Sequence, residues 1–298
     1  MPRAAHAASG GAADTWISSP EGQTLLRPFR GAPYPHSSRE NGYTYDGKFF
    51  AAATHYSDST VGIFIPAGYR PADTVDYVVH FHGWSNHVAA ALDRYELRKQ
   101  MAASSRNAIL LVPQGPKDAA DSGGGRLEEE GAFARLIEEV TQFLVASGKI
   151  RSTRIGRIVL STHSGGYLVT SRILAHGGLG DHISDVFLFD SSYGGLEVFA
   201  DWAAVRGHRL VSIFTDHLAP ENFTLLTLLQ KRHAAVTTIL ESDMSEKLLL
   251  PRKPMLVHAV DLPHDEIIQK RGYLALFLRT IGQESQLRGN HALSPLKK

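Results

Sequence analysis

The sequence predicts an α/β fold: a doubly wound, mostly parallel sheet with an antiparallel N-terminal hairpin. Short apolar runs alternate with stretches of helical periodicity along most of the chain, and such alternation implies crossover connections between parallel strands. Before this alternation, two extended segments at 48–56 and 59–68 are joined by a polar turn, which predicts the hairpin. A chain of 298 residues that is 43% hydrophobic can bury a substantial core.

The predicted parallel strands are short and apolar, as is usual for strands buried on both faces. They cover residues 77–81, 108–113, 157–162, 185–190, 209–214 and 255–260. The predicted helices cover residues 87–105, 128–147, 167–176, 196–205, 219–236 and 264–281.

The chain is expected to form one domain with a segment at each end. We expect an irregular N-terminal arm over residues 1–42, a domain over residues 43–285 and a polar C-terminal tail over residues 286–298. Residues 219–254 are a candidate lid segment because they include a leucine-rich helical stretch, although a core helix fits equally well.

Composition excludes several classes of function. The 31 Lys and Arg residues against 30 Asp and Glu residues give a net charge of +1, which argues against nucleic-acid binding and favours a small-molecule partner. The absence of cysteine excludes disulfides, a cysteine nucleophile and thiolate metal sites. No apolar run approaches the roughly 20 residues of a transmembrane helix. We therefore expect a soluble protein, either cytoplasmic or secreted with its signal removed; the sequence leaves the oligomeric state open.

The stretch LSTHSGGY at 160–167 places Ser164 between a predicted strand and a predicted helix. A serine in this sharp turn is the pattern of a nucleophile elbow, where the residues two before and two after it must be small. Gly166 meets this requirement, whereas Thr162 is bulkier than the usual glycine. Ser164 is therefore the candidate nucleophile.

A serine nucleophile needs a histidine base and an acid that orients the histidine. His264 follows the last predicted strand, and Asp216 follows the strand before it, so the order Ser164, Asp216, His264 agrees with the order that this architecture imposes. Asp190, at the end of the preceding strand, is the alternative acid. We favour Asp216.

Acyl transfer also needs hydrogen-bond donors for the oxyanion. The segment HFHGWSN at 80–86 leaves the first parallel strand and offers the N–H of Trp84, and Gly165 offers the N–H directly after the nucleophile. His82, Tyr167 and Tyr193 are candidate substrate-binding residues, and the aromatic side chains suggest an apolar wall.

Together, the hairpin, the His-Gly turn, the elbow and the later acid and histidine make the chain resemble the α/β-hydrolase-fold serine hydrolases of the esterase and lipase-like superfamily. The resemblance covers roughly residues 43–285. It implies hydrolysis of carboxylic esters through a Ser-His-Asp triad and an acyl-enzyme, with no cofactor.

Three alternatives remain open. An amidase or peptidase of the same fold uses the same triad, and a binding protein on a hydrolase scaffold needs no activity at all. His80 and His82, on one side of a strand, could form a metal-dependent hydrolase site with His264 and Asp265, because imidazole and carboxylate are common metal ligands. This metal site would leave the Ser164 elbow unexplained, so the sequence favours no metal.

Overall fold

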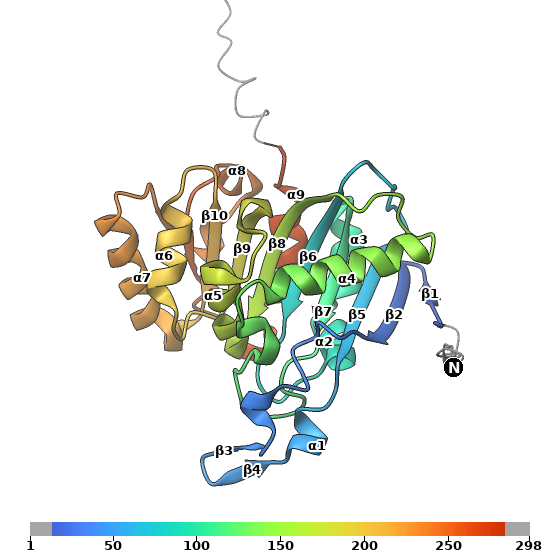
Figure 1. Cartoon of the computed structure of the whole chain (residues 1–298). Helices are drawn as coiled ribbons and strands as arrows, with labels where there is room; N and C mark the ends of the chain where they lie inside the picture. The colour runs from blue at the N-terminus through green and yellow to red at the C-terminus, as the bar shows by residue number, and fades with distance from the viewer. Residues whose placement is uncertain (1–13, 284–298) are drawn as a thin grey trace, which may run out of the picture.

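The fold is a large mixed sheet with helices on both faces and a small separate hairpin (Figure 1). It is a computed structural model that describes residues 14–283. The described strands of the large sheet lie in the order β1 (Ile17–Ser19), β2 (Gly22–Pro28), β5 (Thr60–Pro66), β7 (Ala108–Pro113), β6 (Val75–Phe81), β8 (Ile155–His163), β9 (Ile183–Phe189), β10 (Arg209–Phe214), β12 (Met255–His258) and β11 (Thr237–Leu240). The hairpin consists of β3 (Tyr43–Tyr45) and β4 (Lys48–Phe50).

The described helices fall between these strands. They are α1 (Ala52–His55), α2 (Val88–Arg94), α3 (Leu97–Ser104), α4 (Ala132–Ala146), α5 (Tyr167–His176), α6 (Leu196–Ala204), α7 (Ala219–Lys231), α8 (Glu246–Leu249) and α9 (Tyr273–Arg279). The predicted helix at 87–105 is two helices, because Glu96 adopts a left-handed conformation with φ of 50° between α2 and α3. The predicted helix at 264–281 begins with the short 3-10 helix η7 (His264–Glu266) and continues as α9.

The predicted fold class is confirmed, and all six predicted parallel strands are present. From β7 to β11 every neighbouring pair in the sheet is parallel, whereas β1, β2 and β5 pair antiparallel at the N-terminal edge. The carboxyl ends of the parallel strands therefore lie along one edge of the sheet, where reactive groups of such folds collect.

The pairing of the N-terminal strands differs from the sequence prediction. The segment at 59–68 pairs, as β5, with β2 rather than with the segment at 48–56. The expected irregular arm thus contains two strands, β1 and β2. The reason is burial: almost all of β5 is buried, so it needs a long partner on each side, and the seven residues of β2 supply one where β4 has only three. Residues 1–13 of the arm and the tail at 286–298 lie outside the described residues.

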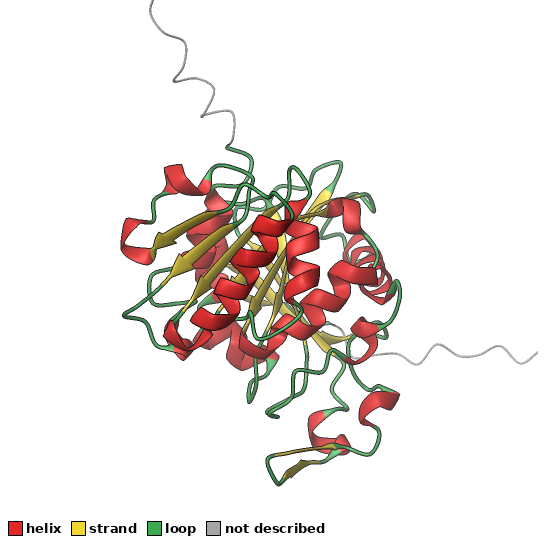
Figure 2. Ribbon diagram, turned by 90° about the vertical axis from the view of Figure 1, so that its left-hand side faces the viewer, coloured by secondary structure: helices red, strands yellow, loops and turns green. Residues whose placement is uncertain are grey.

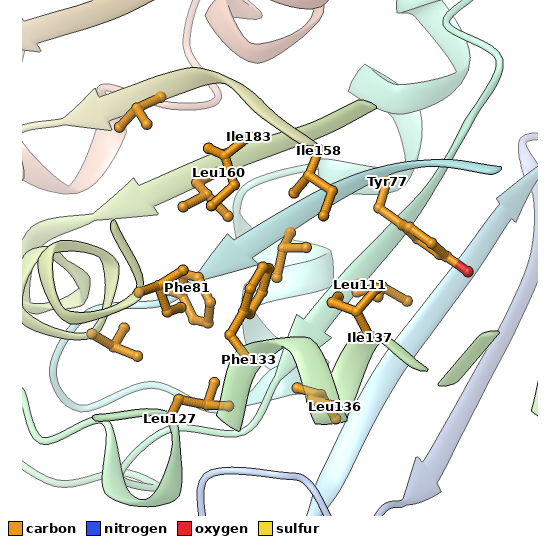
Figure 3. Close-up of a cluster of buried hydrophobic side chains, with 14 of the residues drawn as sticks. Tyr77, Phe81, Leu111, Leu127, Phe133, Leu136, Ile137, Ile158, Leu160 and Ile183 are labelled. Carbon is orange, nitrogen blue, oxygen red and sulfur yellow. The ribbon is translucent and has the colours of Figure 1, made fainter. Parts of the chain in front are cut away.

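Two buried clusters hold the helices to the sheet. Residues of α4, α5, α6 and α7 pack on one face, and residues of α2, α3, α8 and α9 pack on the other. Figure 3 shows Phe133 and Ile137 of α4 against Phe81 and Leu111 of the strands. Full burial of one such side chain contributes about 1.5–3 kcal/mol, so these clusters fix the strand ends that carry the site.

The candidate lid segment at 219–254 contains a helix that packs in the core and a strand of the large sheet. Leu225 and Leu229 of α7 are fully buried in the core, and β11 extends the sheet by pairing with β12. Among residues 14–283, no helix has both the length and the apolar character needed to cross a bilayer.

A buried ion pair ties β9 and β10 to the last helices. Arg209 Nε lies 2.7 Å from Asp185 Oδ1, and the same guanidinium donates to the carbonyl oxygens of Leu249 and Phe277. The Asp185 carboxylate is fully buried. Arg252 also pairs with this carboxylate at 3.2 Å, so the buried charge of Asp185 is shared between two guanidinium groups.

Candidate active site

Ser164 lies in a strained turn at the carboxyl end of β8. Its φ of 52° is left-handed, a conformation that is costly for a residue with a side chain. Ser164 is the first residue of the 3-10 helix η3 (Ser164–Gly166), which leads directly into α5. A Cβ atom at Gly166 would lie 2.2 Å from Thr162 Oγ1 and 2.8 Å from the Phe81 carbonyl oxygen. The turn therefore accommodates the larger Thr162 because residue 166 has no side chain.

Asp190 accepts a hydrogen bond from the ring of His264. The distance from His264 Nδ1 to Asp190 Oδ2 is 2.8 Å, and the carboxylate also accepts from the backbone N–H and the hydroxyl of Thr215, both at 2.8 Å. Asp190 is fully buried at the end of β9. Burial raises its pKa, but the hydrogen bonds from His264 and Thr215 outweigh burial and hold the pKa below its ordinary value. The carboxylate is therefore ionised at neutral pH and fixes the proton of His264 on Nδ1.

Asp216, the acid favoured from the sequence, lies after β10 and makes no hydrogen bond with His264 among the described residues. Its carboxylate accepts from His258 Nε2 at 2.7 Å, and its side chain is 72% exposed. The structure thus brings the alternative residue, Asp190, to His264 and leaves Asp216 paired with a different histidine. The cause is the backbone at the end of β9, where Asp190 turns with φ of 47° toward Thr215 and His264.

The Nε2 nitrogen of His264 is left open. Within the described residues only Nδ1 of this ring has a hydrogen-bond partner, and the ring is partly exposed. Nε2 makes no hydrogen bond with Ser164 Oγ in this structure. Catalytic hydrogen bonds of this kind are often long without substrate and shorten in the complex.

The loop after β6 approaches Ser164 closely. A Cβ atom at Gly83 would lie 2.6 Å from Ser164 Cβ, so only glycine permits this contact. The next residue, Trp84, has a backbone N–H without a hydrogen-bond acceptor among the described residues. Gly165 lies in the first turn of a helix, where N–H groups lack intrahelical acceptors. Both amides are therefore available for an oxyanion.

Solved structures resemble this chain over most of its length. The feruloyl esterase module from Clostridium thermocellum, solved with sinapinate, has a TM-score of 0.51 and 12% sequence identity, covering 85% of this chain and 89% of that one. A structure named FAE has a TM-score of 0.55 and 12% identity, covering 90% of each chain. This chain has the α/β-hydrolase fold. No protein-family model matches the sequence, and no curated protein matches it significantly.

Within this α/β-hydrolase fold, the side chain of His82 supports the loop after β6. Its Nε2 accepts from the backbone N–H of Gly115 at 3.1 Å, so its proton is on Nδ1, which donates to the Gly83 carbonyl at 2.8 Å. Burial lowers the pKa of His82 and keeps the ring neutral. The candidate substrate-binding role of His82 is thus replaced by a structural one, because the side chain is buried and both nitrogens are used.

The structure does not bring His80 and His82 together with His264 as metal ligands. His80 is fully buried with Nδ1 2.9 Å from Ser161 Oγ. Among residues 14–283, the one group of three ligand-type side chains within 4.8 Å of one another is Asp190, His217 and His264. The alternative metal site, with His80, His82, His264 and Asp265 as ligands, is therefore not formed by the described residues.

His163, directly before Ser164, contacts His264, and no sequence pattern predicted this contact. Its Nε2 donates to the His264 carbonyl at 3.1 Å, and the two rings pack with centroids 4.6 Å apart. Its Nδ1 accepts from the hydroxyl of Tyr95 at 2.9 Å, and that hydroxyl accepts from Asn86 Nδ2 at 2.9 Å. This buried chain links the loop after Trp84, the elbow and the backbone of His264.

Burial, the largest effect, lowers the pKa of His163 to about 4, and the neighbouring His264 acts in the same direction. A neutral His163 can accept at Nδ1 and donate at Nε2, as the chain requires. The only sequence signal for this role was the position of His163 beside Ser164.

Aromatic side chains border Ser164, as the sequence suggested. A pocket of about 140 Å³ is lined by Trp84, Ser122, Ser164, Gly165, Tyr167 and Tyr193. Ser122 was missed because it belongs to a glycine-rich loop with no recognised motif. Its hydroxyl accepts from the indole N–H of Trp84 at 2.8 Å.

The loop that carries Ser122 is anchored from the N-terminal region. Arg39 makes a bidentate ion pair with the buried Asp121, at 2.6 Å and 3.0 Å, and Tyr34 donates to the Gly123 carbonyl at 3.0 Å. The β3–β4 hairpin projects at the same end of the molecule (Figures 1 and 2). Its Tyr45 packs edge-on against Trp84, with ring centroids 4.7 Å apart.

Proposed function

We propose that this chain is a carboxylic ester hydrolase that uses Ser164 as nucleophile, His264 as base and Asp190 as the acid that orients His264. The observation that carries the proposal is the 2.8 Å hydrogen bond between His264 Nδ1 and the buried Asp190, next to a serine in a strained left-handed turn. A triad requires both features.

In acylation, Nε2 of His264 takes the proton of Ser164 as Oγ attacks the ester carbonyl carbon. The N–H groups of Trp84 and Gly165 stabilise the oxyanion, typically by about 3–4 kcal/mol for each donor. The imidazolium then gives its proton to the alcohol oxygen, and the carbon–oxygen bond breaks. Asp190 stays ionised throughout and stabilises the imidazolium.

In deacylation, water attacks the acyl-enzyme while His264 takes a proton from it. The second tetrahedral intermediate collapses, the carboxylic acid leaves, and Ser164 recovers its proton from the imidazolium. These steps need no metal or cofactor. A buried neutral His163 at the back of the His264 ring favours this cycle, because it holds the His264 backbone without adding a second positive charge.

The choice of ester over amide rests on the structural neighbours. One of them is named as a feruloyl esterase module. Amide hydrolysis by the same groups is the second candidate, since it differs only in protonation of an amine leaving group.

The test compares hydrolysis of short alkyl esters by wild type, Ser164→Ala, Asp190→Asn and Asp216→Asn. Ser164→Ala should lose turnover, and Asp190→Asn should lower kcat by about 10³–10⁴-fold because it favours the wrong imidazole tautomer. Asp216→Asn is the matched control and should retain kcat within about twofold. Full activity in Ser164→Ala would contradict the mechanism, and a larger loss in Asp216→Asn than in Asp190→Asn would contradict the assignment of the acid.

A further inference from the structure

The pocket beside Ser164 has the size of one aromatic ring. Its volume is about 140 Å³, and an apolar protein cavity of roughly 150 Å³ is known to bind benzene. Ser164 and Gly165 are themselves part of its lining, so a group in this pocket lies directly beside the nucleophile.

The walls of the pocket are aromatic and partly exposed. Trp84 is 40% exposed and Tyr193 is 42% exposed, although large aromatic side chains are usually covered. Tyr167 packs beside Tyr193 with ring centroids 5.9 Å apart. Exposed aromatic faces around a small cavity favour a flat ring, which can stack on them or meet them edge-on.

The orientation of Trp84 is fixed before any ligand binds. Its indole N–H donates to Ser122, Tyr45 packs against its ring, and a Cβ atom at Gly165 would lie 2.6 Å from its Cδ1. Any side chain at residue 165 would therefore displace the indole. A wall that is held in place in this way costs little to order on binding.

We propose that this pocket is a binding site for one aromatic ring of the substrate, so that the preferred substrates are esters that carry a single ring close to the scissile carbonyl. The proposal rests on the proposed ester hydrolysis and adds the substrate class. The ring belongs to the acyl group or to the alcohol, and the experiment below separates these two sources.

The experiment measures kcat/KM on matched pairs of esters, with proton release as the readout. In the acyl series, methyl benzoate, methyl phenylacetate and methyl 3-phenylpropanoate are each compared with the methyl ester of the corresponding cyclohexyl acid. In the alcohol series, benzyl acetate is compared with cyclohexylmethyl acetate. We expect an aromatic preference of about three- to tenfold in one of the series, the usual advantage of an aromatic contact over equal apolar area. Methyl 2-naphthoate should lose this preference, because two fused rings exceed the pocket.

Variants then locate the preference. Trp84→Leu and Tyr167→Leu should bring the ratio of aromatic to cyclohexyl kcat/KM toward one. Phe223→Leu is the matched control: Phe223 is an exposed aromatic residue of α7 that lines a different groove, so its replacement should leave the ratio unchanged.

Labelling by a fluorophosphonate distinguishes failure of the pocket proposal from failure of the hydrolase mechanism on which it rests. Labelling at Ser164 without an aromatic preference in either series would overturn the pocket proposal and leave the proposed hydrolase mechanism standing. An aromatic preference that is equal in wild type and Trp84→Leu would also overturn it. Absence of labelling and of turnover on a folded protein would contradict the hydrolase mechanism, and the pocket proposal with it.

Discussion

The hydroxyl of Tyr95 should matter for catalysis although it lies inside the protein. Tyr95→Phe removes a group that accepts from Asn86 and donates to His163, both at 2.9 Å. The two lost hydrogen bonds, at about 0.5–1.5 kcal/mol each, predict a loss of roughly 1–3 kcal/mol in the free energy of unfolding. Without this contact His163 is free to reorient and release the His264 carbonyl. A misplacement of about 1 Å in a catalytic group costs about 10²-fold in rate.

We therefore expect kcat of Tyr95→Phe to fall by about 10–100-fold with KM nearly unchanged, measured on an ester that wild type hydrolyses. Tyr77→Phe is the matched control, because the Tyr77 hydroxyl is equally buried and bonds to Thr141 Oγ1 at 2.8 Å, within the cluster that packs on α4. It loses one hydrogen bond rather than two, so it should lose about 0.5–1.5 kcal/mol in the free energy of unfolding and keep its kcat. Equal kcat losses in both variants would refute the reasoning, since the effect would then follow stability rather than the position of His264.

Three further predictions concern stability and the walls of the site. Because burial lowers the pKa of His163 from 6.5 to about 4, its contribution to stability is complete above pH 6.5 and is lost as the pH falls toward 4. Between pH 8 and pH 5 this loss is about 2 kcal/mol, and urea unfolding of His163→Phe should show a correspondingly smaller decrease than wild type. Arg209→Leu should lower the free energy of unfolding by about 1–3 kcal/mol, because the buried Asp185 then loses one ionic partner and keeps Arg252, and the carbonyl oxygens of Leu249 and Phe277 lose their donor; a thermal melt unchanged from wild type would argue against this cost. Arg39→Ala should reduce kcat/KM by about tenfold, because the loop that carries Ser122 loses its ion pair at Asp121. A displacement of about 1 Å in a group that positions the substrate can lower the rate by about 10²-fold. Arg27→Ala, which removes the more exposed ion pair with Asp14, is the control and should leave kcat/KM unchanged.

The sequence predicts the elbow and the histidine because their signals are local. Ser164 lies between an apolar strand and a helical stretch, with glycine two residues later, and His264 follows the last of the predicted strands. The parallel core is predictable for the same reason, since each strand is short and mostly apolar.

The acid and the N-terminal pairing depend on contacts between distant residues. Whether His264 meets Asp190 or Asp216 depends on contacts from elsewhere in the chain: His163 of β8 holds the His264 backbone, and Thr215, after β10, holds the Asp190 carboxylate. The strand β2 contains polar residues and lies near the edge of the sheet, so its sequence shows no clear alternation. The pocket walls likewise combine residues 84, 122, 167 and 193, whose proximity no local pattern encodes.

The central claim is that Ser164 is a nucleophile activated by His264. Intact mass after incubation with a fluorophosphonate tests it most directly, on wild type, Ser164→Ala and His264→Ala in parallel. We predict one adduct on wild type, none on Ser164→Ala and a much slower reaction of His264→Ala. A folded wild type without an adduct, or an adduct that persists in Ser164→Ala, would contradict the claim.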